Sequence, residues 1–321
     1  MQLGWSYLAA ASLRSALAKS RPDRVWVIPH EWSIFPLHQV FNQLWCPSPR
    51  VPMHVTIQDF PDTQARLCLL GSRTTKLMAS FQESLYQKAQ SRDATSLPML
   101  EELQLRTGVP GDQMLHAGLE PKDFAFLQNP PPPKISGAPI RIAYTGTIIV
   151  EDEFREFVRI LETLRPTLPS GLELCLWSSH TYRYRDWFRP AWMREYGHVS
   201  ESELRVALRS LDWGFIPMGT TNEDPRYNQF SFPTKFITYL ATGLPVISLG
   251  HPMSSLMQLT RSYRLGLNFF SKEQMAASLG TELLQERHSR QSCRMEIIRC
   301  GKDFFDANQK RTRLWASMGV A

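Results

Sequence analysis

The sequence predicts an α/β protein built from two domains. Its 321 residues suffice for two domains of ordinary size, each with its own apolar core. Short apolar segments alternate with segments of helical periodicity on both sides of a proline-rich stretch. The four consecutive prolines at 130–133 cannot enter a helix or a central strand, so this stretch is predicted to be an interdomain linker.

The composition is typical of a folded globular protein. Hydrophobic residues make up 43% and charged residues 21% of the chain, which argues against intrinsic disorder. The formal net charge of +6 favours an anionic partner and leaves a nucleotide, an acidic membrane surface and nucleic acid open. The five cysteines form no Cys-x-x-Cys pair, so we expect reduced thiols and a cytoplasmic protein. No apolar run approaches the roughly eighteen residues of a membrane span.

The first domain, residues 1–129, is predicted to begin with an amphipathic helix, because its apolar side chains share one helical face. These side chains are Trp5, Leu8, Ala9, Leu13, Ala16 and Leu17. Short apolar segments at 25–28 and 53–57 predict strands. Asp59 follows the second strand, where a carboxylate can act as a base or contact an acceptor, although an aspartate in a turn more often only shapes the turn.

A helix followed by a buried strand is the most informative part of the second domain. Pro233 suits the first turn of the helix, and Gly243 can take the left-handed conformation that closes it. The apolar segment 244–249 then predicts a strand buried on both faces of a parallel sheet. Thr234 and Lys235 add a hydroxyl and an ammonium to the helix N-terminus, so this turn suits a phosphate or a diphosphate. The alternative is a lysine that is only a surface charge.

Residues 233–247 resemble the donor-binding half of the GT-B glycosyltransferases, especially the glycosyltransferase 4 type. In that family a Pro-x-Lys…Tyr-Leu-Ala-x-Gly-x-Pro-Val-Ile segment holds the diphosphate of a nucleotide-sugar. The resemblance implies the GT-B fold, in which two Rossmann-like domains face a cleft. The family opens with a strand and a glycine-rich loop that this chain lacks, so the first domain is expected to be shortened, with its first strand missing.

The resemblance also implies domain boundaries and donor-binding residues. Residues 1–129 would form the acceptor-side domain, 130–139 the linker, 140–300 the donor-binding domain, and 301–321 a helix that returns to the first domain. The donor site is implied by a Tyr-x-Gly-x turn, a Gly-x-Val turn and the helix with its lysine. The corresponding residues are Gly146, Thr147, His198, Val199, Thr234, Lys235 and Thr238.

Departures from the family bear on catalysis. Retaining members carry two glutamates eight positions apart, and these positions hold Phe230 and Thr238 here. Gln58 stands where the family often has the histidine of a His-Asp pair, which argues against a histidine-assisted mechanism beside Asp59. The sequence has no Asp-x-Asp and no cluster of metal ligands, so we expect no metal and no cofactor besides the nucleotide-sugar substrate.

The function predicted from these residues is metal-independent transfer of a sugar from a nucleotide-diphosphate donor to a glycan or a lipid-linked acceptor. The protein would be cytoplasmic, with peripheral contact at the inner membrane face. The missing glutamates favour a degenerate GT-B protein that binds a nucleotide or a partner without turnover, and the same architecture hosts sugar-nucleotide epimerases. Net charge and the aromatic, basic stretch 182–194 favour a nucleic-acid-binding protein, but such stretches are more often partly buried surface, so we expect no nucleic-acid partner.

Overall fold

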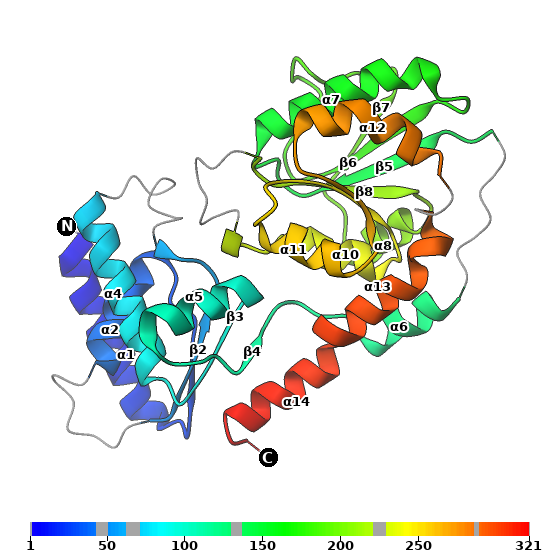
Figure 1. Ribbon diagram of the computed structural model, residues 1–321. Coiled ribbons are helices and arrows are strands. Elements are labelled where there is room, and N and C mark those ends of the chain that lie inside the picture. The colour runs from blue at the N-terminus through cyan, green and yellow to red at the C-terminus, as the bar shows by residue number, and fades with distance from the viewer. Residues whose placement is uncertain are drawn as a thin grey trace. The chain divides into compact units, whose positions relative to one another are not determined.

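The computed structural model describes residues 2–42, 51–61, 71–129, 137–220, 229–285 and 289–320. The chain forms two compact units, and each combines segments from distant parts of the sequence (Figure 1). The first unit comprises residues 1–116, 224–232 and 309–321, and the second comprises residues 117–223 and 233–308. The proline run at 130–133, predicted to be part of the linker, lies outside the described residues.

A parallel sheet with the order β1-β2-β3-β4 forms the centre of the first unit. Its strands are β1 (Val25–Val27), β2 (Met53–Ile57), β3 (Ser91–Ala94) and β4 (Gln113–Met114). The described helices of this unit are α1 (Gln2–Ser20), η1 (Glu31–Ser33), α2 (Ile34–Phe41), α4 (Ser72–Lys88), α5 (Leu97–Thr107) and most of α14 (Ala307–Ser317). Because the strands are parallel, their carboxyl ends lie at one edge of the sheet.

The core of the first unit lies around β2, whose five residues are all buried. Val55 and Ile57 belong to an apolar cluster that includes residues of α4 and α5. A polar network is buried in the same sheet, where His54 Nδ1 lies 2.7 Å from Ser91 Oγ and His54 Nε2 lies 3.0 Å from Asp93 Oδ2. Because His54 and Asp93 are almost fully buried, this network joins β2 to β3 and offers no accessible reactive group.

The helix α1 forms as predicted, but its buried face is shifted: Ala9, Leu13 and Leu17 of the predicted face are half-buried, whereas Trp5 and Leu8 are not. Ser6 and Ala10 are buried, and Gln39 Nε2 of α2 donates a hydrogen bond to Ser6 Oγ over 3.1 Å. Trp5 and Leu8 were expected on the apolar face, yet they are 52% and 72% exposed. Small side chains allow the close packing of α1 on α2, so the face is selected by fit and not by hydrophobicity alone. No helix in the described part of the chain is long and apolar enough to cross a membrane.

The second unit contains a six-stranded parallel sheet with the order β10-β9-β8-β5-β6-β7. Its strands are β5 (Ile140–Thr145), β6 (Leu172–Trp177), β7 (Met193–Gly197), β8 (Trp213–Pro217), β9 (Val246–Leu249) and β10 (Gly266–Phe269). Its helices include α6 (Pro121–Gln128), α7 (Glu151–Leu164), α8 (Glu201–Leu208), α10 (Thr234–Ala241), α11 (Ser255–Ser262), α12 (Lys272–Leu283) and α13 (Arg290–Phe304), with η2 (Arg165–Thr167) after α7.

The strand order places a topological switch point between β5 and β8. The chain starts this sheet at β5, proceeds outward through β6 and β7, and then returns to the other side of β5 with β8. In open α/β sheets the connections on the two sides of such a point diverge, which leaves room for a ligand outside the carboxyl ends of the strands. The loops that follow β5 and β8 are therefore the first place to look for a site.

The helix α10 is fixed against the end of β5 by Tyr239. The buried Tyr239 hydroxyl accepts a hydrogen bond from the backbone N–H of Thr145 over 3.1 Å. Gly214 of β8 permits this packing, because a Cβ there would lie 2.5 Å from the Tyr239 ring. The helix ends as predicted, with Gly243 in the left-handed conformation at a φ of 65°. The N-terminus of α10 is thereby held at the switch point.

Candidate functional site

The first turn of α10 lies at the carboxyl edge of the second sheet and carries Lys235. Pro233 is the residue before the helix, and no side chain caps the helix N-terminus. The first backbone N–H groups of a helix have no partners within the helix and carry a partial positive charge. Thr234 is exposed and Lys235 is half-buried, so both a hydroxyl and an amine accompany these N–H groups. This turn has the properties of an anion-binding site.

Lys235 is joined to the turn after β5 through Tyr144. Its Nζ donates a hydrogen bond to the Tyr144 hydroxyl over 2.8 Å and lies 4.0 Å from the centroid of the ring. The Tyr144 hydroxyl in turn donates to the Thr147 carbonyl over 2.8 Å. Since a hydroxyl has a single hydrogen, the two bonds require Tyr144 to accept from Lys235. The structure thus brings together two segments that the sequence predicted separately.

Burial lowers the pKa of Lys235 to about 7. No ion pair between Lys235 and a carboxylate occurs within the described ranges of the chain. An ammonium in such surroundings pays a desolvation cost that a bound anion would offset. A bound anion would therefore stabilise the charged form of Lys235.

The turn after β5 has the conformation expected of a close approach to a ligand. Gly146 has a φ of 83°, which favours glycine, and both Gly146 and Thr147 are exposed. The Gly146 N–H donates to the Trp177 carbonyl over 2.8 Å, and the N–H of Ile148 donates to the Tyr182 hydroxyl over 3.1 Å. The turn is consequently fixed from several sides while its outer surface stays accessible.

The remaining predicted donor residues, His198, Val199 and Thr238, lie at the same edge of the sheet but do not share the hydrogen bonds of Lys235. His198 is exposed and Val199 half-buried, and both follow β7, the edge strand of this sheet. Thr238 is half-buried, one turn along α10 from Thr234. Among the described residues no hydrogen bond links these three to Lys235. Their roles as donor ligands stay predictions.

A buried carboxylate at the switch point was missed by sequence reasoning. Glu153, in the first turn of α7, is 7% exposed, and its Oε1 accepts hydrogen bonds from the N–H and the hydroxyl of Thr220, both over 3.1 Å. Thr220 follows β8, so this contact spans the switch point. The available signal was an acidic residue in the first turn of a helix, a common feature that does not by itself indicate a ligand site.

Asp59 of the first unit lies at the carboxyl end of β2 beside a histidine that the sequence did not pair with it. The Ser231 hydroxyl donates to Asp59 Oδ1 over 3.1 Å, and His30 Nε2 lies 4.0 Å from Asp59 Oδ2. Burial raises the pKa of the Asp59 carboxyl. Gln58 occupies the family's histidine position, but His30 brings an imidazole to the carboxylate from the end of β1. A histidine therefore lies near Asp59 although Gln58 occupies the family position, and the role of Asp59 stays a prediction.

Phe230, at one of the two positions where retaining family members have glutamate, belongs to the core of the first unit. Its ring is 3% exposed and packs edge to face on Phe60, with 5.0 Å between the ring centroids. Its carbonyl accepts a hydrogen bond from the buried Ser96 hydroxyl over 2.6 Å. A glutamate carboxylate at this position would be buried among apolar side chains, which would destabilise its charged form.

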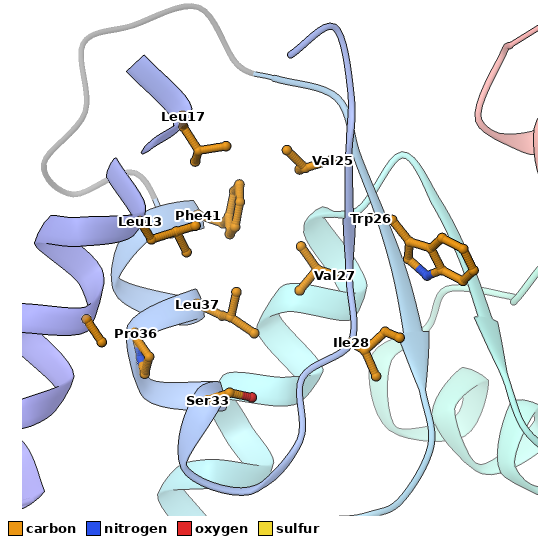
Figure 2. Close-up of a pocket in the computed structure, with 11 residues that line it drawn as sticks. Leu13, Leu17, Val25, Trp26, Val27, Ile28, Ser33, Pro36, Leu37 and Phe41 are labelled. Carbon is orange, nitrogen blue, oxygen red and sulfur yellow. The ribbon is translucent and has the colours of Figure 1, made fainter. Parts of the chain in front are cut away.

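An apolar pocket of about 370 Å³ lies in the first unit between α1, β1 and α2. Figure 2 shows Leu13 and Leu17 of α1 facing Val27 of β1 and Leu37 of α2. Ser33 is the single polar residue of its lining. The pocket suits an apolar group and lacks the polar groups that catalysis needs.

The aromatic and basic stretch 182–194 does not present free positive charge. Each of its arginines lies within 4 Å of a carboxylate: Arg183 of Glu195, Arg185 of Glu151, Arg189 of Glu162 and Arg194 of Glu173. The aromatic side chains of Tyr182, Trp187 and Trp192 belong to the apolar core. The features that favoured nucleic acid in the sequence therefore serve the structure of the second unit.

No family model and no curated protein matches the sequence. Among solved structures, sucrose-phosphate synthase from Thermosynechococcus elongatus is similar with a TM-score of 0.68 at 13% identity, covering 96% of this chain and 75% of that one. Anabaena HepE in complex with UDP and glucose is similar with a TM-score of 0.63 at 11% identity, covering 98% of this chain and 81% of that one. A third similar structure is from Listeria monocytogenes and is provisionally described as a UDP-N-acetylglucosamine 2-epimerase. Its TM-score is 0.57 at 12% identity, and the match covers 98% of this chain and 78% of that one. With two parallel α/β units, the chain has the GT-B fold that its sequence predicted.

Proposed function

We propose that the protein is a glycosyltransferase that binds a nucleoside-diphosphate sugar in its second unit. The observation that carries the proposal is Lys235, a poorly solvated amine in the first turn of α10, hydrogen-bonded across the switch point to Tyr144. The similar Anabaena structure contains UDP and glucose, and that ligand supports a nucleotide-sugar donor by analogy of fold.

The site has the chemistry that a diphosphate leaving group requires. As the bond between the sugar and the diphosphate breaks, negative charge grows on the leaving group, and groups placed in advance to receive it lower the barrier. The helix N-terminus and Lys235 supply that positive charge. The described residues include no group of three or more His, Cys, Asp or Glu able to hold a metal ion. We therefore propose transfer without a metal or any other cofactor.

We propose a glycan or a lipid-linked acceptor, handled by the first unit in the cytoplasm with peripheral contact at the inner membrane face. The pocket shown in Figure 2 has a volume and an apolar lining suited to a lipid chain. Trp5 and Leu8, which are three residues apart on α1, are both exposed, and exposed apolar side chains on one helical face are a property of proteins that contact membranes from one side.

Thermal unfolding in the presence of UDP, GDP, ADP or CMP tests the donor site. A ligand at 100 times its dissociation constant adds about 2.7 kcal/mol to the free energy of unfolding. We expect one nucleotide to raise the Tm of the native protein and to have no effect on Lys235→Met. Lys272→Met is the matched control, because Lys272 begins α12 after β10 at the same edge of the sheet. The donor site is wrong if no nucleotide raises the Tm or if Lys235→Met keeps the full shift.

An assay of turnover, with the sugar derivative of the nucleotide that raises the Tm, distinguishes an enzyme from a protein that only binds the nucleotide. Release of free nucleotide, with glycan and lipid-linked hydroxyl acceptors and in the presence of EDTA, is the expected result. Binding without turnover would identify a degenerate GT-B protein, which Phe230 and Thr238 at the positions of two family glutamates favour. Conversion of the sugar without nucleotide release would instead indicate an epimerase, the activity named for the Listeria structure.

A further inference from the structure

A buried carboxylate in the second unit has one oxygen that the protein leaves without a partner. Glu153 is the third residue of α7 and is 7% exposed. Its Oε1 accepts both hydrogen bonds from Thr220, and its Oε2 has no hydrogen-bond partner among the described residues. Oε2 is not one of the fully buried unpartnered polar atoms of the described chain, so it reaches solvent. A carboxylate that is nearly buried and only half bonded is costly unless a ligand supplies a further donor.

The loop that carries Thr220 is anchored to the neighbouring strand β9. The N–H of Met218 donates to the Leu249 carbonyl over 2.7 Å, and the N–H of His251 donates to the Gly219 carbonyl over 3.1 Å. The two bonds from Thr220 hold the Glu153 carboxylate against this anchored loop. Its position is therefore defined before any ligand binds.

Packing around Tyr144 connects Glu153 to Lys235. Phe154, the next residue along α7, packs edge to face on the Tyr144 ring, with 4.8 Å between the ring centroids. Lys235 Nζ donates its hydrogen bond to the hydroxyl of that same tyrosine. Glu153 and Lys235 form no ion pair with each other in the part of the chain that the structure describes. The switch point therefore carries an amine and a carboxylate, and neither neutralises the other.

The two charges suit the two ends of a nucleotide-sugar. An ionised carboxylate only accepts hydrogen bonds, and ionised phosphate oxygens do the same, so Glu153 cannot bind the diphosphate. Sugar hydroxyls can donate to it. Because the sugar is bonded directly to the diphosphate, a diphosphate held by Lys235 brings the sugar to the same switch point.

We propose that Glu153 is a specificity-determining residue that accepts a hydrogen bond from a hydroxyl of the donor's sugar and excludes sugars that carry an acid group. The inference rests on the proposed glycosyltransferase function and narrows its donor to a neutral hexose derivative. Like charges brought together in a poorly solvated site disfavour the wrong partner strongly, so one carboxylate suffices for this discrimination.

Binding to the native protein tests the proposal without any variant. The probes are the free nucleoside diphosphate that raises the Tm and its hexose and hexuronic acid derivatives, which for UDP are UDP-glucose and UDP-glucuronic acid. Calorimetry should give the hexose derivative a Kd at least about tenfold below that of the hexuronic acid derivative. Equal Kd values, or tighter binding of the hexuronic acid derivative, would overturn the proposal.

Glu153→Gln separates recognition of the sugar from a structural role. The amide keeps an oxygen for the two bonds from Thr220 but removes the charge. The Kd of the hexose derivative should rise about tenfold, as expected for the loss of a hydrogen bond to a charged group. The Kd of the hexuronic acid derivative should fall, and that of the free diphosphate should change little. A purely structural role would instead weaken the binding of all three ligands together, and that result would overturn the proposal.

Asp152→Asn is the matched control, because Asp152 is exposed in the same turn of α7 and the variant loses the same charge. It should leave the ratio of the two Kd values unchanged. An equal change of this ratio in Asp152→Asn and Glu153→Gln would overturn the proposal, since the overall charge of the helix would then explain it.

The proposed function fails in a different way from the role of Glu153. If no diphosphate raises the Tm, the donor site and the specificity residue are both wrong. If the Tm shift depends on Lys235 but the native protein shows no preference for the hexose derivative, the donor site stands and only the role of Glu153 is overturned.

Discussion

If Lys235 binds the diphosphate as proposed, its burial makes nucleotide binding depend on pH. Burial lowers the pKa of Lys235 to about 7, and a bound diphosphate would raise it again. Above about pH 7 the free protein must take up a proton on binding, so affinity is highest below that pH and falls as pH rises through it.

Calorimetry between about pH 7.5 and 9, above the last pKa of a phosphate group, measures this proton uptake through buffers of different ionisation enthalpy. The native protein should take up close to one proton near pH 8. Lys235→Arg stays charged, so its affinity should be nearly constant over this range. A native protein that binds with no proton uptake at pH 8 would contradict the prediction.

Tyr144 should set the pH at which affinity falls. Tyr144→Phe keeps the ring but removes the hydroxyl that accepts from Lys235 and donates to the Thr147 carbonyl. Loss of the acceptor disfavours the charged amine, so the midpoint should move to lower pH and affinity at pH 8 should fall about tenfold, the equivalent of one hydrogen bond.

Tyr182→Phe is the control for Tyr144→Phe, because it also removes a hydroxyl that is hydrogen-bonded to the turn after β5. Tyr182 accepts from the N–H of Ile148 and has no hydrogen bond to Lys235 among the described contacts. We expect it to lower affinity by a similar factor at every pH, with an unchanged midpoint. Identical midpoints for Tyr144→Phe and the native protein would show that the hydroxyl has only a structural role.

The sequence could reveal Lys235 but not His30, for a physical reason. Lys235 acts within one local element, a helix N-terminus, whose signals lie side by side in the chain. The proximity of His30 and Asp59 depends on β1 and β2 being neighbouring strands. It also depends on Gln82 of α4, which donates hydrogen bonds to the carbonyls of Pro29 and Asp59. Both are properties of the tertiary fold. Glu153 was missed for the same reason, because its partner Thr220 follows a different strand.

At the scale of elements, α1 carries the clearest prediction. Trp5, Tyr7 and Leu8 are exposed on α1 while the buried face uses Ser6 and Ala10. If the exposed surface contacts lipid, changing Trp5 and Leu8 to serine should abolish sedimentation with anionic vesicles.

The Tm should stay within about 2 °C of native, because exposed substitutions seldom change the free energy of unfolding by more than about 0.5 kcal/mol. Leu105→Ser is the matched control, since Leu105 is 82% exposed on α5 of the same unit. Equal loss of sedimentation for the control, or full retention in the double variant, would remove α1 from the membrane proposal.

Elements with strong local signals were predicted well, and faces chosen by tertiary fit were not. The closure of α10 at Gly243 was predictable because a glycine in the left-handed conformation is a local property. The burial of Ser6 in place of Leu8 on α1 was not predictable, because it depends on the shape of α2. The order of the strands follows from parallel α/β connections in general terms, whereas their register requires the structure.

At the scale of the molecule, residues 309–320 should stabilise the first unit. Lys310 donates to the Met114 carbonyl at β4, Gln113 donates to the Lys310 carbonyl over 3.4 Å, and Leu314 is buried. A chain ending at Asn308 loses these contacts, and burial of one leucine alone is worth about 2 kcal/mol.

Differential scanning calorimetry of this truncated chain should show a lowered unfolding transition for the first unit and a retained nucleotide-induced shift of the second. Two equally lowered transitions would contradict this assignment, because residues 117–223 and 233–308 supply the compact second unit. Leu314→Ala in the full chain gives an intermediate comparison, with the backbone contacts of Lys310 retained.

The way the first unit is assembled has a consequence for biosynthesis. Its three segments are separated in the chain by the whole of the second unit, and the last of them begins at residue 309. A ribosome therefore releases every segment of the second unit before the final segment of the first. During translation the second unit can therefore fold before the last segment of the first unit has been synthesised. Premature termination before residue 309 would yield a chain with a complete second unit and an incomplete first unit.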